Sequence, residues 1–338
     1  MNDIFETNKP VEIIDRFIIK PGHQRSLHDL MTQEYARHVQ SRGLRLAGAW
    51  LTPPFERSDA DSELTVVWEY PTLGALWAAR MAEEDDPVVR DIWAKAEKMT
   101  TARSRQLARS WSMDLPPPDD SGEIAVGVKG QRTILFVRPT GALNEAEEPM
   151  WIAAIEGLAR ADARILHSRA GFHQEYSFMP GHFTWDMVAI EPMDEAALLA
   201  ALPGAAEIVE AVALGEPLDA GLRNPDIGGT KRTILVRTED GLDGPAVAAF
   251  EKAMIDTPRY ITAIRNWRVT RVTSSRGGWT LCLEQEVPDA SVFVGDYLNH
   301  PYHWAVVERL FHPDAPERLA NGFCHTLYPV ARSVLAEI

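Results

Sequence analysis

The chain contains 338 residues, of which 45% are hydrophobic and 25% are charged, a composition typical of soluble globular proteins. One hydrophobic core rarely serves so long a chain, so we expect two or three domains of roughly 100–150 residues each. The 34 lysines and arginines are outnumbered by 49 aspartates and glutamates, which gives a net charge of −15. Such an acidic chain is a poor partner for nucleic acids and for anionic membrane surfaces. A small-molecule substrate and further copies of the chain are the expected partners.

No apolar run reaches ~18 residues, the length that crosses a bilayer, so no membrane span is predicted. Residues 1–7 lack the basic and apolar regions of a secretory signal. Cys282 and Cys324 lie in apolar, strand-like runs, and two cysteines cannot build a disulfide framework. These features predict a cytoplasmic protein.

A short repeat divides the chain into similar parts. Residues 131–138, QRTILFVR, recur as residues 231–237, KRTILVR, and internal similarity of this kind marks repeated structural units. Each copy is an apolar run followed by turn residues and then by a helical pattern. Residues 11–22 show the same order and end in Lys20-Pro21-Gly22. Three units are therefore predicted.

The elements after each first strand keep one order. In the first unit we expect a helix over 23–42, strands over 44–51 and 64–69, a helix over 73–98 and a strand over about 107–113. In the middle unit we expect a helix over 145–160, strands over 164–175 and 182–190, and a helix over 194–213. No fourth strand is found there, because residues 217–225 resemble a turn. In the third unit we expect a helix over 244–255, strands over 265–273 and 278–286, a helix over 290–310 and a strand over 322–330.

The repeated β-α-β-β-α-β order is that of the ferredoxin-like α+β fold. Turn-rich linkers lie at 115–122 and 224–230, so the expected modules are residues 1–117, 123–223 and 230–338. A four-stranded sheet with both helices on one face needs a cover for its other face. We therefore expect two modules to pack sheet against sheet, as in dimeric α+β barrels. The remaining sheet would be covered by a second chain, which gives a homodimer.

Residues 296–304, DYLNHPYHW, resemble the Tyr-x-x-His-Pro-x-His segment of the stress-responsive dimeric α+β barrel (Dabb) domain, a family that includes olivetolic acid cyclase. The resemblance covers roughly residues 230–332. The first unit is similar to the NIPSNAP branch of the same superfamily, in Lys20-Pro21-Gly22 and in the strand at 66–70. Neither of the other units has a His-Pro-x-His motif, so one site of this type is expected.

The resemblance makes His303 and Tyr297 the catalytic candidates. An imidazole can move a proton near neutral pH, and a phenol can hold a developing oxyanion; neither role requires a metal or an organic cofactor. His300 and Trp304 are candidates for contact with the substrate. Each of these side chains also has a structural alternative, as a core residue or, for His300 beside Pro301, as a partner of backbone groups where a helical turn begins.

A second cluster is expected in the middle unit. On a regular strand, His167, Arg169, Gly171 and His173 share one face. There they could line a pocket for an anionic group, with Arg169 as a clamp for a carboxylate. The alternative is that this face meets solvent.

Neither a metal nor an organic cofactor is expected. His300 and His303 have no third ligand at a recognisable spacing, and no phosphate loop or dinucleotide fingerprint is present. Some barrels of the superfamily bind haem, but no residue here can be nominated as an axial ligand.

The motifs favour a cofactor-independent carbon–carbon lyase that acts on a small aromatic, phenolic or polyketide-like molecule. Decarboxylation, retro-aldol cleavage and aldol cyclisation all need only proton transfer, support for an oxyanion and a dry pocket. Two alternatives stay open: a non-catalytic, stress-related oligomer that binds a hydrophobic ligand, and a cofactor-free isomerase or monooxygenase of the same superfamily.

Overall fold

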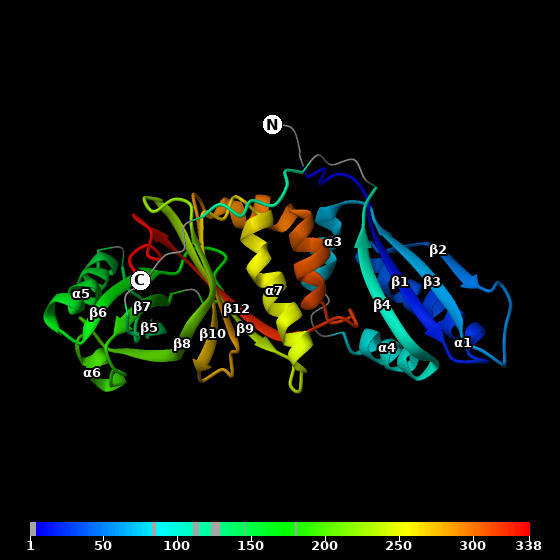
Figure 1. The fold of residues 1–338 in the computed structure, drawn as a ribbon, viewed down its shortest axis with the longest axis horizontal. Coiled ribbons are helices and arrows are strands. Elements are labelled where there is room, and N and C mark those ends of the chain that lie inside the picture. The colour runs from blue at the N-terminus through cyan, green and yellow to red at the C-terminus, as the bar shows by residue number, and fades with distance from the viewer. Residues whose placement is uncertain (1–4, 83–85, 111–114, 123–128, 145, 180) are drawn as a thin grey trace. The chain divides into compact units, whose positions relative to one another are not determined.

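The computed structural model describes residues 5–82, 86–110, 115–122, 129–144, 146–179 and 181–338. The chain divides into two compact units, each of which is described by itself (Figure 1). Unit 1 comprises Met1–Pro117 and Leu298–Arg318, and unit 2 comprises Pro118–Tyr297 and Leu319–Ile338. The order β-α-β-β-α-β recurs three times, so the chain consists of tandem ferredoxin-like α+β modules.

Unit 1 holds the first module. Its antiparallel sheet has the order β2-β3-β1-β4 and is formed by β1 (Val11–Ile19), β2 (Arg45–Thr52), β3 (Ser62–Tyr70) and β4 (Thr100–Ala108). Its helical segments are α1 (Gln24–Asp29), η1 (Leu30–Tyr35), α2 (Ala36–Val39), η2 (Gln40–Arg42), α3 (Leu73–Ala82) and α4 (Pro87–Met99). The strand order is that of a ferredoxin-like sheet.

One face of this sheet carries the core of unit 1. Alternate residues of β1 are buried, as the two-residue period of a strand dictates, and they pack with Tyr35, Trp68 and Trp93. Trp304, from the separate segment at 298–318, belongs to the same core and is only 3% exposed. The first module is therefore completed by residues that lie almost two hundred positions later in the sequence.

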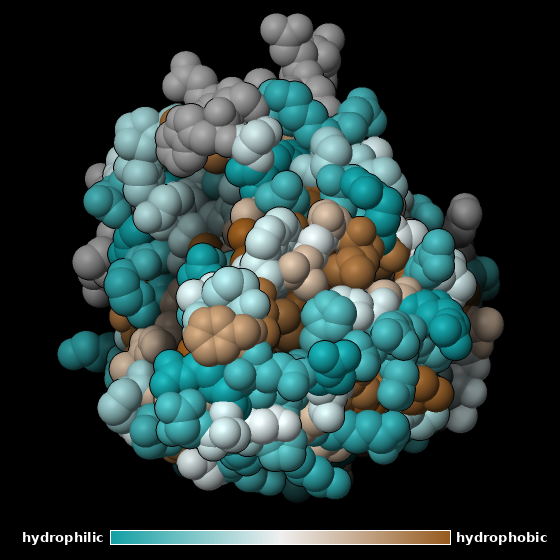
Figure 2. Space-filling view, turned by 90° about the vertical axis from the view of Figure 1, so that its right-hand side faces the viewer, coloured by the Kyte–Doolittle hydropathy of each residue, from teal (hydrophilic) through white to brown (hydrophobic). Residues whose placement is uncertain are grey.

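The opposite face of this sheet is less buried. It carries Ile14 and Ile18 of β1, Val67 of β3 and Trp50 of β2, and Trp50 is 55% exposed. Figure 2 views the molecule from the side on which β2 and β3 lie in Figure 1, and it shows hydrophobic groups in the middle of a largely hydrophilic surface. The second chain expected over this face stays a prediction.

The last strand of unit 1 begins earlier than the sequence pattern predicts. The prediction of a strand at 107–113 placed the start of the strand too late, because β4 begins at Thr100. Residues 111–113 lie outside the described residues. Two arginines obscured the hydrophobic alternation of this strand, because Arg103 and Arg105 point to the helix-covered face, where hydrophobic residues are expected. Arg105 is buried there through a bidentate pair with Asp15, with both N–O distances at 2.8 Å.

The expected single helix over 73–98 is two helices. Asp86 accepts hydrogen bonds from the backbone nitrogens of Val88 and Val89 and so caps α4, which has Pro87 in its first turn. An aspartate cap followed by proline is a strong start signal for a new helix.

Unit 2 holds the second module and the strands of the third in one eight-stranded sheet of order β12-β9-β11-β10-β8-β5-β7-β6. Residues 298–318, expected in the third module, belong to unit 1. The strands are β5 (Gln131–Pro139), β6 (Ile165–Phe172), β7 (Phe183–Ala189), β8 (Ala206–Leu222), β9 (Gly229–Thr238), β10 (Asn266–Ser274), β11 (Leu281–Val287) and β12 (Ala320–Val330). Its helical segments are α5 (Glu148–Ala161), α6 (Glu195–Ala200), α7 (Gly244–Tyr260) and η3 (Phe293–Tyr297). Figure 1 shows α5 and α6 beside the strands of the second module and α7 beside those of the third.

The strand β8 joins the two modules. Its first half pairs with β5 and its second half pairs with β10. On the other side, the backbone nitrogens of Gln174 and Phe178 donate to the carbonyl oxygens of Leu327 and His325 on β12, at 2.8 and 3.0 Å. The sheet is thus closed into a barrel, which confirms the intramolecular pair of modules expected from the sequence.

The middle unit does have a fourth strand, and the prediction of a helix over 194–213 was wrong beyond residue 200. The helix α6 ends at Ala200, just before Leu202-Pro203-Gly204. From Ile208 to Leu214 buried residues alternate with more exposed ones, a strand period that the alanines among them obscured. The expected turn at 217–225 was also wrong in part, because β8 continues to Leu222 across bulges in its pairing with β10.

The two copies of the repeat point their side chains in opposite directions. On β5, Arg132 and Ile134 face the barrel interior; on β9, Lys231 and Leu235 do so. Arg232 consequently lies on the outer face of its strand, under the helical segment η3. A shift of one residue turns every side chain of a strand to the other face of the sheet, so identical residues in the two copies of the repeat lie on opposite faces.

The expected helix over 290–310 is interrupted at its motif. It consists of the π-helical segments η3 and η4 (Tyr302–Val307) and a 3₁₀ turn, η5 (Glu308–Leu310). Pro301 lacks a backbone N–H and cannot continue the hydrogen-bond ladder of a preceding helix, and η4 starts directly after it. Within the described residues, no helix is long and apolar enough to cross a membrane.

Candidate anion-binding site

Arg232 is the centre of a candidate site in unit 2. It is only 8% exposed. Its guanidinium carbon lies 4.8 Å from the centre of the Phe293 ring and 4.7 Å from that of the Tyr297 ring. Its Nη2 donates a hydrogen bond of 3.0 Å to Nδ1 of His325. Strands β9 and β12 and the segment η3 therefore surround one positive charge with aromatic rings.

This charge lacks a counterion. In the part of the chain that the structure describes, Nε and Nη1 of Arg232 are buried and have no hydrogen-bond acceptor. Burial lowers the pKa of the guanidinium, and Tyr297 opposes the shift in part, but an arginine stays protonated at neutral pH. A buried charge without a partner is costly. A ligand oxygen that carries negative charge would remove this cost, so the arrangement suits an anion.

His325 supports the arginine as a neutral group. Burial, and secondarily the charge of Arg232, lower the pKa of His325 to about 3. Because Arg232 can only donate, Nδ1 of the imidazole accepts and Nε2 carries the hydrogen. The histidine therefore orients the guanidinium without competing for an anion.

A segment of the second module forms part of the surroundings. The ring centre of Phe178 lies 4.3 Å from that of His325 and 5.3 Å from that of Phe323. Tyr176, two residues earlier, has a positive φ of 72°, which is uncommon for an aromatic residue and costs of order 1–3 kcal/mol. The site of the third module thus depends on a strained segment that lies between β6 and β7.

Tyr297, a catalytic candidate from the sequence, lies at this site. It is 4% exposed, and its ring meets that of Phe293 edge to face at 6.0 Å. Its position beside a buried guanidinium suits a phenol that donates to an oxyanion. Its catalytic role stays a prediction.

The other motif residues lie in unit 1. His303 is 7% exposed, and its ring lies 5.5 Å from that of Trp77. Nδ1 of His300 accepts a hydrogen bond of 3.1 Å from the backbone nitrogen of Tyr302, which is the contact that the structural alternative requires, and burial lowers the pKa of His300 to about 4. Trp304 donates from Nε1 to the carbonyl of Asn299 at 3.2 Å. The roles of these side chains in substrate binding and catalysis stay predictions.

The second cluster from the sequence lies on β6 and just after it. Arg169 forms a bidentate pair with Glu337, at 2.9 and 3.1 Å, and a further contact of 3.1 Å with Glu156. His173 contacts Thr184 through Nε2 at 2.9 Å, and His167 is 8% exposed. Burial lowers the pKa of both histidines to about 4. Arg169 already has two carboxylate partners, so its use as a substrate clamp, like substrate contacts of both histidines, stays a prediction.

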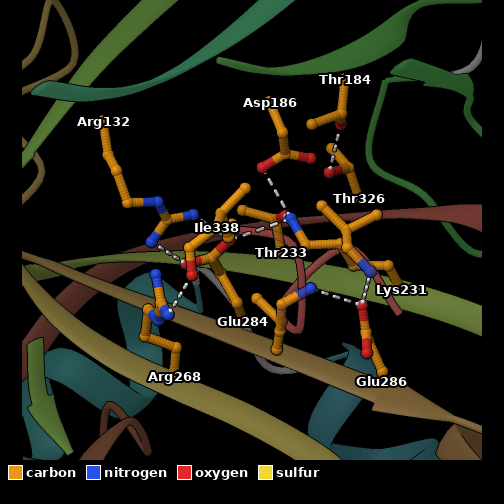
Figure 3. Close-up of polar contacts among 12 residues, drawn as sticks. Arg132, Thr184, Asp186, Lys231, Thr233, Arg268, Glu284, Glu286, Thr326 and Ile338 are labelled. Carbon is orange, nitrogen blue, oxygen red and sulfur yellow. Dashed lines mark hydrogen bonds and ion pairs between the residues drawn. The ribbon is translucent and has the colours of Figure 1, made fainter. Parts of the chain in front are cut away.

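A network of ion pairs fills the interior of the barrel (Figure 3). Glu284 accepts two hydrogen bonds of 2.8 Å from Arg132 and lies 2.9 Å from Nζ of Lys231. Lys231 also donates to Asp186 at 2.7 Å, and Asp186 accepts from the hydroxyl of Tyr328 at 2.5 Å. These five residues come from five strands of both modules. The network therefore joins the modules, and every one of its charges has a partner, in contrast to Arg232.

Sequence reasoning missed Arg232. The only available signal was an arginine inside an apolar strand, in the repeat that marks the modules. Arg132 carries the same signal and is an ordinary member of the ion network. Among the described residues, no group of three or more histidine, cysteine, aspartate or glutamate side chains is placed to hold a metal ion.

Comparisons with known proteins concern the fold alone. No family model and no curated protein matches the chain. An anthrone oxidase-like protein matches 62% of this chain and 94% of its own, with a TM-score of 0.45 and 10% identity. A putative monooxygenase from Lactobacillus acidophilus matches 59% and 93%, with a TM-score of 0.35 and 8% identity. A NIPSNAP domain protein from Burkholderia xenovorans matches 31% and 99%, with a TM-score of 0.24 and 13% identity. Similarities this low carry no argument about activity.

Proposed function

We propose that the chain is a cofactor-independent lyase that cleaves a carbon–carbon bond in a small aromatic, phenolic or polyketide-like substrate. The observation that carries the proposal is the buried guanidinium of Arg232, which lies beside the phenol of Tyr297 and lacks an acceptor for Nε and Nη1 among the described residues. Such a site favours a state in which negative charge has developed on a substrate oxygen.

The chemistry needs only the groups at hand. When a carbon–carbon bond breaks by decarboxylation, carbon dioxide departs; in retro-aldol cleavage a base removes the proton of the β-hydroxyl group and a carbonyl fragment departs. In both reactions the electron pair of the broken bond moves into a conjugated carbonyl and leaves negative charge on that oxygen. Arg232 and Tyr297 would donate hydrogen bonds to it in a site shielded from water, where such bonds are strongest. A proton then returns to the carbon from a general acid. Aldol cyclisation is the same sequence run in the bond-forming direction.

The test is turnover without added cofactor. Purified protein is incubated with a panel of phenolic and β-keto acids, and mass spectrometry follows the loss of carbon dioxide, formaldehyde or water. Arg232→Met is expected to lower kcat about 100-fold or more, the usual cost of losing an oxyanion donor. Arg237→Met, an exposed position on the same strand, is the matched control and is expected to leave kcat within twofold.

His303→Gln tests the motif histidine separately. A catalytic role for His303 predicts that kcat falls at least 100-fold and that one limb of the pH–rate profile is lost. Unchanged turnover in this variant, with folding checked by circular dichroism, would make His303 structural. Binding of the panel without any turnover by the wild type would contradict a lyase and favour the non-catalytic alternative. Turnover that requires oxygen would favour a monooxygenase.

A further inference from the structure

Gln285 lies directly beside Arg232. It is 1% exposed, and it is the cross-strand partner of Arg232 in the β11–β9 register. Side chains at directly opposed positions lie on the same face, with Cβ atoms about 4.5–5.5 Å apart. Gln285 is therefore on the same outer face of the sheet, next to the guanidinium of Arg232.

Gln285 presents an acceptor where Arg232 presents donors. Among the residues that the structure describes, none donates a hydrogen bond to its buried Oε1. The guanidinium of Arg232 donates from Nη2 to His325 and lies against the rings of Phe293 and Tyr297. One buried acceptor and two buried N–H donors are thus unsatisfied on directly opposed residues of neighbouring strands. An unsatisfied buried polar group is costly, so this arrangement is complementary to a ligand that brings both kinds of group.

We infer that Gln285 is a specificity-determining residue that selects substrates with a hydroxyl group adjacent to the oxyanion held by Arg232. An oxygen of the anionic group accepts from Arg232, and the neighbouring hydroxyl donates to Oε1 of Gln285. The substrate class is a hydroxy-substituted aromatic acid. A site built to accept a hydrogen bond rejects the analogue that lacks the donor, because its own buried acceptor is then unpaired. This inference rests on the site used for the proposed function.

The experiment measures binding rather than turnover, with three probes: benzoate, 2-hydroxybenzoate and 2-methoxybenzoate. Isothermal titration of the full chain is expected to show 2-hydroxybenzoate bound at least tenfold more tightly than either of the others. Gln285→Met keeps the size of the side chain and removes the acceptor, so the preference is expected to fall to within twofold while benzoate binding changes little. Gln106→Met, an exposed position on β4, is the control and is expected to keep the preference.

A second variant at the same position keeps the inference testable if Gln285→Met does not fold. Gln285→Glu places a carboxylate beside Arg232 and is expected to weaken binding of all three anions at least tenfold, without loss of the folded state in circular dichroism. A preference that survives in Gln285→Met overturns the inference. If Arg232→Met still abolishes anion binding in that case, the proposed function stands. Failure of the wild type to bind any of the three probes overturns the inference as well, and the turnover panel then decides the proposed function independently.

Discussion

Arg132 and Arg232 are two buried arginines whose partners differ, and the partner of a buried charge decides whether the charge stabilises the fold. Both are arginines in the same Arg-Thr-Ile-Leu sequence, and both are at least nine-tenths buried. Arg132 forms a bidentate pair with Glu284 inside the barrel. Arg232, on the outer face of its strand, contacts the neutral His325 and the side chains of Phe293 and Tyr297, and no carboxylate pairs with it among the described residues.

The two arginines should therefore respond oppositely to the same substitution. Arg132→Met leaves Glu284 with fewer partners and is expected to lower the free energy of unfolding by about 3–5 kcal/mol. Arg232→Met removes an uncompensated charge and is expected to raise it by about 1–2 kcal/mol, at the expense of anion binding. Urea unfolding of both variants measures the difference. Equal losses of stability would mean that Arg232 is paired in the folded protein.

Buried histidines predict the acid sensitivity of unit 2. Burial lowers the pKa of His167 and His173 to about 4 and that of His325 to about 3, below the ordinary value of about 6.5 in an unfolded chain. Between these values the unfolded chain binds more protons, so stability falls as the pH falls from 6.5 towards 4 and is fully present above 6.5.

Each of these histidines is expected to remove roughly 1–2 kcal/mol of stability between pH 7.5 and pH 5. His325→Gln, which cannot be protonated, should lessen the pH dependence by that amount. His23→Gln, at an exposed position, is the control. Urea unfolding at the two pH values tests this, and an identical pH dependence in wild type and His325→Gln would rule it out.

At the scale of elements, the order of strands and helices was predictable and the interruptions were not. Hydrophobic period and turn residues located ten of the described strands, because these signals are local. β4 was shifted by its inward-facing arginines, whose partner Asp15 lies ninety residues away in the sequence. Alanines obscured the alternation of buried and exposed residues in β8. This strand also pairs with strands of two modules, which no local sequence pattern shows. The site was partly predictable: Tyr297 came from a motif, whereas Arg232 and Gln285 depend on which face of a strand is covered.

Closure of the barrel between β6 and β12 depends on a glycine. A Cβ at Gly171 would lie 2.1 Å from a ring carbon of Tyr328, and that ring is fixed by the bond to Asp186. Gly171→Ala is expected to lower the free energy of unfolding by about 1–3 kcal/mol, because the core cannot expand to fit the methyl group. Gly157 in α5 has open space around its Cβ position, so Gly157→Ala is expected to raise stability by about 0.5–1 kcal/mol. Thermal or urea unfolding compares the pair, and a neutral Gly171→Ala would show that the two strands are not held close.

At the scale of the whole molecule, the strands of the second and third modules close one barrel within unit 2, whereas the sheet of unit 1 has one face that is less buried. The open face of unit 1 carries Ile14, Ile18, Val67 and the exposed Trp50. We expect a second copy of the chain to cover it, as the sequence predicts. Sizing chromatography with light scattering should give a dimer at micromolar concentration, and Ile18→Lys should give a monomer that is still folded. A monomeric wild type would exclude this assembly.

The return of residues 298–318 to unit 1 has a consequence for synthesis of the protein. The core of the first module contains Trp304, so it cannot be completed when the ribosome has finished residue 117. At translation rates of about 5–20 residues per second, this tryptophan emerges roughly 10–40 s later. In that interval unit 2 has most of its strands available. The amino-terminal module therefore gains its full core only after most of the chain has been synthesised, and a nascent chain that stalls before residue 304 would present an incomplete hydrophobic core to chaperones and proteases.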